Sequence, residues 1–257
     1  MTTGPHFIGL GMQKSGSSFL FNALSRHPDI RFPVRAERLE GLSTNIVDGV
    51  QVNTLPKEVH FLKGRNSEMS WEQYLSLFET DDPTTKTGEI TPLYASASVE
   101  RIRELKDHCP DVRLFAVIRH PVARDWSAIR MIGARQGVLE DDDALERIAN
   151  IGQIHMMGDY APMLENWLSV FDRSSLWFEQ TERMKIHPEK ILTSLFQHLD
   201  VDPARLKKEL PGEVHKGPEK ACPPRIHALL AERHAGRLGR LMELTGLEFS
   251  QDASLVG

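Results

Sequence analysis

Near its start, the chain places one lysine and three serines where an apolar run gives way to a helical pattern. The run is HFIGLGMQKSGSSFLFNAL, residues 6–24. A helix N-terminus favours an anion through its free backbone N–H groups and the positive end of its dipole, and a glycine lets the backbone approach that anion closely. The segment therefore predicts a phosphate-like anion site, formed by Lys14, Ser15, Gly16, Ser17 and Ser18.

This turn departs from the nucleotide-binding pattern Gly-x-x-x-x-Gly-Lys-Ser/Thr, because Lys14 precedes Gly16. A second apolar strand, residues 112–118, is followed directly by Arg119 and His120, where a magnesium-dependent ATPase or kinase would carry an aspartate. Both departures argue against a P-loop nucleotide kinase. That class stays open as an alternative, together with a non-catalytic nucleotide-binding protein.

Positive charge is concentrated after this second strand. Residues 112–135 hold five arginines and a single acid, in a chain whose net charge is −5. Arg119 follows the strand directly, at the edge where open α/β sheets bind ligands, and Ser127 comes two turns into the next helix, which Pro121 opens. The pattern favours a ligand role for Arg119. Solvent exposure is expected for two arginines further along the helix, Arg130 and Arg135.

KSGSSF and VIRHPVARDWSAIR, in this order and about a hundred residues apart, resemble the 5′-phosphosulfate loop and the 3′-phosphate motif of sulfotransferases that use 3′-phosphoadenosine 5′-phosphosulfate (PAPS). The resemblance is closest to the heparan-sulfate branch. It continues through KEVHFL (57–62), GEITPLYA (88–95) and HKGPEKACPPRIHALL (215–230), and it covers residues from about 6 to 249. The chain is thus identified as a soluble, bacterial-type member of the PAPS-dependent sulfotransferases.

The resemblance implies that residues 14–18 wrap the 5′-phosphosulfate, that Arg119 and Ser127 hold the 3′-phosphate, and that Lys216 and Gly217 close over the nucleotide. PAPS would be the donor, 3′,5′-ADP the product, and no metal is expected. A guanidinium matches phosphate oxygens two at a time, whereas Lys14 is better used as a point charge on the bridging or sulfuryl oxygen. The implied reaction is in-line transfer to a hydroxyl of a small alcohol, a glycan or a lipid headgroup.

An acceptor hydroxyl must lose its proton, so a base is expected. The resemblance places a glutamate at Glu58, and the alternation in KEVHF puts Glu58 and His60 on one face of an extended segment. His60 is the alternative, either orienting the glutamate or acting as the base. Glu89 is a third candidate, expected to hold Lys14 or to orient the acceptor. Ile90 stands where several relatives have a basic residue, which argues against a polyanionic glycan.

Length and composition fit one α/β domain: the chain has 257 residues, of which 40% are hydrophobic and 26% charged. We expect a single P-loop-like sulfotransferase domain over residues 1–257, with a central parallel β-sheet flanked by helices. No apolar run reaches the ~18 residues of a membrane span, and no signal-peptide pattern occurs, so a soluble cytoplasmic protein without a nucleic-acid partner is expected. The oligomeric state stays open. Cys109 and Cys222 are expected to be reduced thiols, with a single bridge as the alternative.

Hydrophobic periodicity and turn residues place the remaining elements. Strands are expected at 6–11, 85–89, 112–118 and 176–179, and helices at 71–78, 98–107, 141–150, 160–171 and 188–199. One long helix, 224–244, is expected to pack over the nucleotide loop. The irregular stretch 35–56 should frame the acceptor site. The acid-rich segment 137–147 is expected to be solvated, with recognition of a basic acceptor as the alternative.

Overall fold

The structure is a computed structural model, and it describes residues 4–33, 45–47, 50–52, 57–206 and 219–250. Lys216 and Gly217 lie outside these residues. The centre of the fold is a five-stranded sheet in the order β2–β5–β1–β6–β7, and every neighbouring pair is parallel. Its strands are β1 (Phe7–Gly11), β2 (Ile30–Arg31), β5 (Lys86–Ile90), β6 (Arg113–Ile118) and β7 (Leu176–Gln180). The predicted parallel α/β fold is confirmed.

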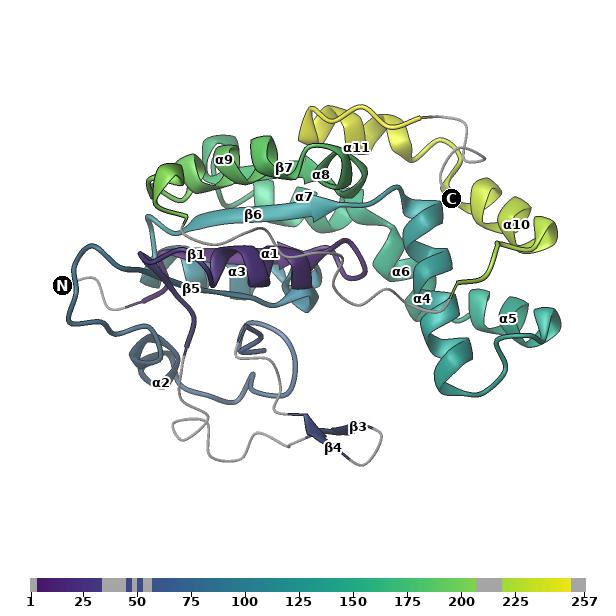
Figure 1. Cartoon of the computed structure of the whole chain (residues 1–257), viewed down its shortest axis with the longest axis horizontal. Helices are drawn as coiled ribbons and strands as arrows, with labels where there is room; N and C mark the ends of the chain where they lie inside the picture. Colours follow the sequence, from purple (N-terminus) through teal and green to yellow (C-terminus); the bar gives the residue numbers. More distant parts are fainter. Residues whose placement is uncertain (1–3, 34–44, 48–49, 53–56, 207–218, 251–257) are drawn as a thin grey trace.

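Helices cover both faces of this sheet (Figure 1). Apart from the helix expected at 224–244, the predicted helices are present, with ends that differ by a few residues, and further short helical segments join them. The α-helices are α1 (Ser17–Leu24), α2 (Trp71–Ser76), α3 (Val99–His108), α4 (Pro121–Arg135), α5 (Asp142–Ala149), α6 (Gly152–Gly158), α7 (Tyr160–Leu168), α8 (Thr181–Ile186), α9 (Pro188–His198), α10 (Pro224–His234) and α11 (Leu238–Thr245). The 3₁₀ turns are η2 (Pro92–Ser96), η3 (Arg173–Ser175) and η4 (Pro203–Arg205).

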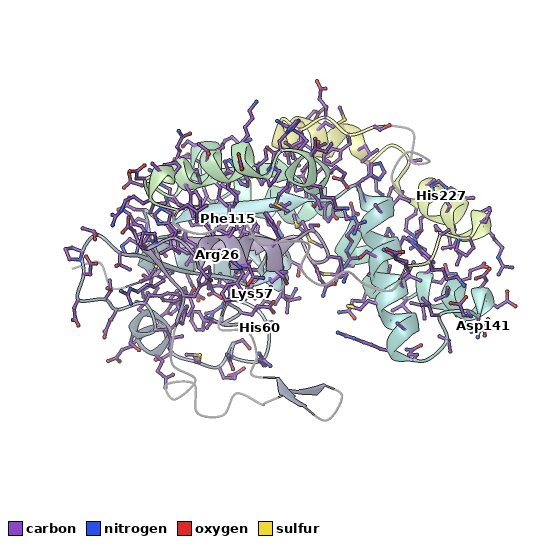
Figure 2. The ribbon with its side chains drawn as sticks, in the orientation of Figure 1. Arg26, Lys57, His60, Phe115, Asp141 and His227 are labelled. Atoms are coloured by element: carbon purple, nitrogen blue, oxygen red, sulfur yellow. The ribbon has the colours of Figure 1, made fainter. Side chains whose placement is uncertain are left out.

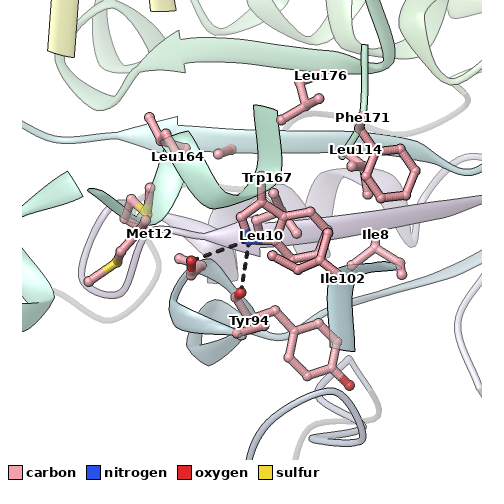
Figure 3. Packing of buried hydrophobic residues seen from close by; sticks show 14 of the residues in the cluster. Ile8, Leu10, Met12, Tyr94, Ile102, Leu114, Leu164, Trp167, Phe171 and Leu176 are labelled. Carbon is pink, nitrogen blue, oxygen red and sulfur yellow. Dashed lines mark hydrogen bonds between the residues drawn. The ribbon is translucent and has the colours of Figure 1, made fainter. Parts of the chain in front are cut away.

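The core follows from the alternation of side chains along the strands. On one face, Ile8 and Leu114 pack with helices α3, α7 and α11. On the other, Phe7 and Phe115 pack with α1 and α9. Trp167 of α7 is fully buried, and its indole N–H lies 3.1 and 3.2 Å from the carbonyl oxygens of Tyr94 and Ala95 (Figure 3). This contact fixes α7 against the turn that follows β5.

The expectation of one long helix at 224–244 is wrong. The chain leaves α10 at Ala235 (ψ 133°), and Gly236 takes a left-handed conformation with φ 76° before α11 begins. Each half then packs on a different partner: α10 lies against α4 and α5, whereas α11 lies against α7. Figure 1 shows α10 with α4 and α5 at one end of the molecule. The described C-terminal helices therefore brace α4 and α7, and the packing of one long helix over the nucleotide loop is not observed.

The structure tests two further expectations. Within 35–56, the described residues form an antiparallel ladder, β3 (Asn45–Val47) with β4 (Val50–Val52), so this stretch is not wholly irregular. The acid-rich segment 137–147 meets basic residues of the C-terminal segment. Lys220 lies 3.3 Å from Glu140, and Arg225 pairs with Asp143 and Glu146. These ion pairs explain the acids without a basic acceptor.

Two observations bear on the remaining expectations about the chain. Among the described residues, each helix is too short or too polar to span a lipid bilayer. Cys109 and Cys222 are free thiols, as predicted, and burial raises the pKa of each to about 11.

Gly88 of β5 tests the packing of the central strands. A Cβ added there would lie 2.3 Å from the carbonyl oxygen of Phe7 on β1. We expect Gly88→Ala to lower the free energy of unfolding by about 3 kcal/mol in urea titrations, because backbone must move. Gly239→Ala on α11 is the control, since its added Cβ meets nothing within 4 Å. It should be neutral or stabilise by up to about 1 kcal/mol, and equal losses in both variants would contradict this packing.

Candidate active site

The turn between β1 and α1 has the geometry of an anion site. Gly16 precedes the helix with φ 96° and ψ 15°, a left-handed conformation that favours glycine. A Cβ there would lie 2.7 Å from Cε of Met184. The first hydrogen bond at this helix end runs from the Phe19 N–H to the Gly16 carbonyl oxygen (3.0 Å), so the amides of Ser17 and Ser18 precede it. Amides in this position point towards a ligand at the helix end.

Side chains from neighbouring elements hold this turn in place. The Ser15 hydroxyl accepts a hydrogen bond from the Arg119 backbone N–H (3.3 Å), and the Ser15 carbonyl accepts one from the Thr181 hydroxyl (2.9 Å). The Ser15 side chain thus joins the loop to the end of β6. Gln13 accepts two further hydrogen bonds, from Nε (3.2 Å) and Nη2 (2.7 Å) of Arg124.

Arg124 belongs to a buried network. It is 1% exposed, and its Nη1 lies 2.9 Å from Oδ1 of Asp125 and 3.1 Å from the carbonyl oxygen of Ile154. The other oxygen of Asp125 lies 2.9 Å from Nε2 of His234. A buried charge is tolerated when it is paired and hydrogen-bonded, as it is here. Arg124 therefore connects the loop to α4, α6 and α10, and its N–H groups bond protein groups that hold the loop in place.

Other cations surround the loop. Burial lowers the pKa of Lys14, and the charges of nearby arginines lower it further; these are Arg119, Arg135, Arg130 and Arg124. The Lys14 ammonium itself lies 3.7 Å from Sδ of Met131 on α4. Arg119 and Ser127 are both half-buried, at the end of β6 and on α4. Arg135 is exposed, as expected, but Arg130 is half-buried, with its guanidinium 5.8 Å from the Trp126 ring centroid.

The candidate base lies beside the same loop. Oε1 of Glu58 is 3.0 Å from Nζ of Lys57, and Oε2 is 3.2 Å from Nε2 of His60. Nζ of Lys57 also lies 3.2 Å from Oγ of Ser17, the first residue of α1. Figure 2 shows Lys57 and His60 close together beside this helix. One ammonium group therefore connects the carboxylate to the helix end.

Two opposing effects set the pKa of Glu58. Burial raises it, but the hydrogen bond to His60 and the charge of Lys57 outweigh burial, so the pKa lies below its ordinary value. His60 reaches Glu58 from a left-handed backbone conformation (φ 61°), and a Cβ added at Gly64 would lie 2.9 Å from its Nδ1. The predicted proximity of Glu58 and His60 is confirmed, and the contact fits an orienting role for His60.

Glu89 holds the segment that carries Glu58. Its carboxylate is fully buried and accepts four hydrogen bonds: from the Val59 N–H (2.9 Å) and from the hydroxyls of Tyr74 (2.7 Å), Thr91 (2.6 Å) and Tyr94 (3.0 Å). Burial raises the pKa of Glu89, and these hydrogen bonds oppose the rise. The structure thus gives Glu89 a role other than contact with Lys14.

Two more contacts fix the same segment. The Tyr94 hydroxyl accepts a hydrogen bond from the Phe61 N–H (2.6 Å), and the Lys57 carbonyl accepts one from the Ile90 N–H (2.7 Å). The Ile90 side chain is buried on the opposite face of the sheet, with Phe7 and Leu20. Lys57 is a further ammonium in the site, and the sequence pattern did not single it out. The alternation rule placed Lys57 opposite Glu58, because it treats residues 57–61 as a strand.

Among the described residues, the structure has no cluster of three or more His, Cys, Asp or Glu side chains that could hold a metal ion.

Comparison with known proteins shows the family and the fold. A family model described as "Sulfotransferase family" matches residues 5–204, which is most of the chain. The chain belongs to the sulfotransferase family. Among solved structures, it resembles a sulfotransferase from Alicyclobacillus acidocaldarius, with a TM-score of 0.65, 20% identity and coverage of 95% of this chain and 97% of the other. It also resembles the sulfotransferase domain from the curacin biosynthetic pathway, with a TM-score of 0.52, 18% identity and coverage of 98% and 89%.

Curated relatives of this sulfotransferase are also distant in sequence. It is 23% identical over 227 residues to a bifunctional heparan sulfate N-deacetylase/N-sulfotransferase 1 of Caenorhabditis briggsae, covering 82% of this chain and 24% of the relative. It is 26% identical over 194 residues to a heparan sulfate glucosamine 3-O-sulfotransferase 6 of Mus musculus, covering 72% and 48%. The chain thus spans less than half the length of these relatives.

The four hydrogen bonds to Glu89 predict a large stability effect. Glu89→Ala leaves four buried donors without their acceptor, so we expect this sulfotransferase to lose about 3–5 kcal/mol in its free energy of unfolding. Glu243→Ala is the matched control, because that glutamate is exposed and pairs with Arg240 on the surface. It should cost less than about 1 kcal/mol. Urea titration of both variants measures the difference, and a loss at Glu89 as small as the control would contradict the anchoring role.

Proposed function

We propose that this protein transfers the sulfuryl group of PAPS to an acceptor hydroxyl, without a metal ion, and that Glu58 is the base. The observation that carries this proposal is the position of Lys57, whose ammonium contacts both Ser17 at the start of α1 and the Glu58 carboxylate. An anion held at the helix end therefore lies within a few ångströms of a carboxylate. In-line transfer needs this arrangement, because the acceptor oxygen must meet the sulfur opposite the leaving group.

The loop residues fit the 5′ end of the donor. The amides of Ser17 and Ser18, the left-handed Gly16 and the Lys14 ammonium would hold the 5′-phosphosulfate. Ser15 would shape the loop, because its N–H, carbonyl and hydroxyl already bond Met12, Thr181 and Arg119. Negative charge builds up on the phosphate as the S–O bond breaks, and positioned N–H groups and cations stabilise it. The chemistry thus needs only groups that this chain supplies.

Arg119 and Ser127 would hold the 3′-phosphate, as the sequence motif implies. The charges that lower the pKa of Lys14 come from four arginines, among them Arg119 at the end of β6. The loop and the end of β6 therefore lie in the same region of positive potential. Such a field suits a ligand with phosphate groups at two points. Lys216 and Gly217 stay predictions as residues that close over the nucleotide, and so do one domain over residues 1–257 and a cytoplasmic location.

Glu58 would take the acceptor proton while His60 keeps the carboxylate in position. The hydroxyl oxygen forms its bond to sulfur as its proton passes to Glu58, and the 3′,5′-ADP phosphate leaves with the electrons of the broken S–O bond. The relatives' names include an O-sulfotransferase and N-sulfotransferases acting on heparan sulfate. We infer a hydroxyl acceptor on a small alcohol, a glycan or a lipid headgroup.

Calorimetry with 3′,5′-ADP tests the donor site. We expect binding of equal strength in EDTA and in magnesium, and about tenfold or greater weakening in Arg119→Ala, because a charged hydrogen-bond donor is lost. Arg147→Ala, at an exposed position on α5, is the control and should bind as wild type does. Magnesium-dependent binding of ATP in place of 3′,5′-ADP would support the kinase alternative and contradict this site.

A labelled-sulfate assay across alcohols, phenols, sugars and amines tests the base. Glu58→Gln should lower kcat by about 10²–10⁴-fold without weakening the affinity for 3′,5′-ADP, since the amide cannot accept the proton. Normal turnover in Glu58→Gln with inactivity in His60→Asn would make His60 the base. Donor binding without transfer to any acceptor class would favour the non-catalytic alternative.

A further inference from the structure

Lys57 is the most completely buried ammonium in the candidate site. The residue is 2% exposed, and among the described residues its Nζ contacts Oε1 of Glu58 at 3.0 Å and the Ser17 hydroxyl at 3.2 Å. Burying an ammonium is costly unless it is paired with an opposite charge. Glu58 supplies that charge, so Lys57 and Glu58 form an ion pair at the edge of the anion loop.

This pairing works against the use of Glu58 as a base. Both carboxylate oxygens have a partner, Lys57 on one side and His60 on the other. A neighbouring ammonium favours the charged form of a carboxylate and so weakens its affinity for a proton. The conformation seen here is therefore that of a restrained base.

The same ammonium can move towards the loop with little displacement, because it already contacts Ser17. A phosphosulfate at the helix end carries more negative charge than the Glu58 carboxylate, and it would compete for Lys57. The backbone around Lys57 is fixed, since its carbonyl bonds the Ile90 N–H and the Val59 N–H bonds Glu89. Only the side chain has to change its partner.

We propose that Lys57 couples donor binding to the base: it pairs with Glu58 before the donor binds, and then moves onto the phosphosulfate, which leaves Oε1 of Glu58 open to the acceptor proton. This inference rests on the proposed function. It makes Lys57 a catalytic residue, because its ammonium reaches the reacting group. It also makes proton removal strong only when a sulfuryl donor is present.

Few charged groups surround Glu58 among the described residues. Its own segment presents Lys57 and His60, α1 presents the uncharged Ser17 hydroxyl, and β5 presents Glu89 behind Val59. On α3, the Arg101 guanidinium is bonded to the Phe61 carbonyl oxygen (3.2 Å). Among the described residues, the charged or titratable groups that contact the Glu58 carboxylate are Lys57 and His60. A change at Lys57 should therefore alter the pKa of Glu58 directly.

Two pH profiles test the coupling in wild type. The acid limb of kcat/KM for the donor reports Glu58 before donor binding, and the acid limb of kcat reports it afterwards. A base must be unprotonated to act, so activity falls as the pH drops through its pKa. Lys57 holds this pKa down, and its departure raises it. We therefore expect the kcat limb to lie at higher pH than the kcat/KM limb, and coinciding limbs would overturn the proposal.

Lys57→Met removes the ammonium charge and so measures how much Lys57 contributes to the pH difference between the two acid limbs. The kcat/KM limb should move to higher pH by about one unit, and the kcat limb should stay nearly in place, because Lys57 has already left Glu58 there. Titration of the donor is common to both proteins and cancels in the comparison. A shift of both limbs by the same amount, or of neither, would mean that Lys57 stays on Glu58 or plays no part.

Two further variants serve as controls. Lys57→Arg keeps the charge and should keep the two limbs separate. Lys63→Met removes a nearby ammonium, which bonds the Ser96 carbonyl oxygen, and should leave both limbs unchanged. Each variant is first checked for 3′,5′-ADP binding by calorimetry, which confirms folding. Wild type that neither binds 3′,5′-ADP nor transfers sulfate would defeat the proposed function, whereas transfer with coinciding limbs would defeat only the coupling.

Discussion

Four hydrogen bonds converge on the buried carboxylate of Glu89, and the geometry of the candidate site depends on them. They fix residues 57–61 against the end of β5, although that segment forms no strand of its own. Glu58 and Lys57 are therefore held beside the start of α1. Arg124 does the same for the other side of the site, where it bonds Gln13 and pairs with Asp125. Buried charges that are fully paired thus support the groups that face the ligand.

Electrostatics distinguishes the ligand-facing groups from this scaffold. The chain has a net charge of −5, yet burial lowers the pKa of Lys14 and the charges of four nearby arginines lower it further. Like charges gathered at one sheet edge repel one another, so a bound polyanion would stabilise them. A nucleotide with phosphate at both ends has the matching charge pattern. In the proposed function, acceptor choice would belong to loops around this edge of the sheet, since loops vary more freely than the scaffold that carries them.

Local sequence signals predicted the elements that depend on local physics. The apolar strands, Gly16 before α1 and Pro121 at the start of α4 appear where the pattern put them. Predictions failed where contacts between distant residues decide the outcome. Gly236 breaks the expected long helix, and the two halves pack on different helices. Residues 57–61 form no strand, so the alternation rule misplaced Lys57.

A crystal structure with bound 3′,5′-ADP tests most directly whether the loop and the end of β6 hold the two ends of one nucleotide. We expect the 5′-phosphate against the amides of Ser17 and Ser18, and the 3′-phosphate against Arg119 and Ser127. Density for the nucleotide at another site, or with its phosphates turned away from this edge of the sheet, would contradict that arrangement.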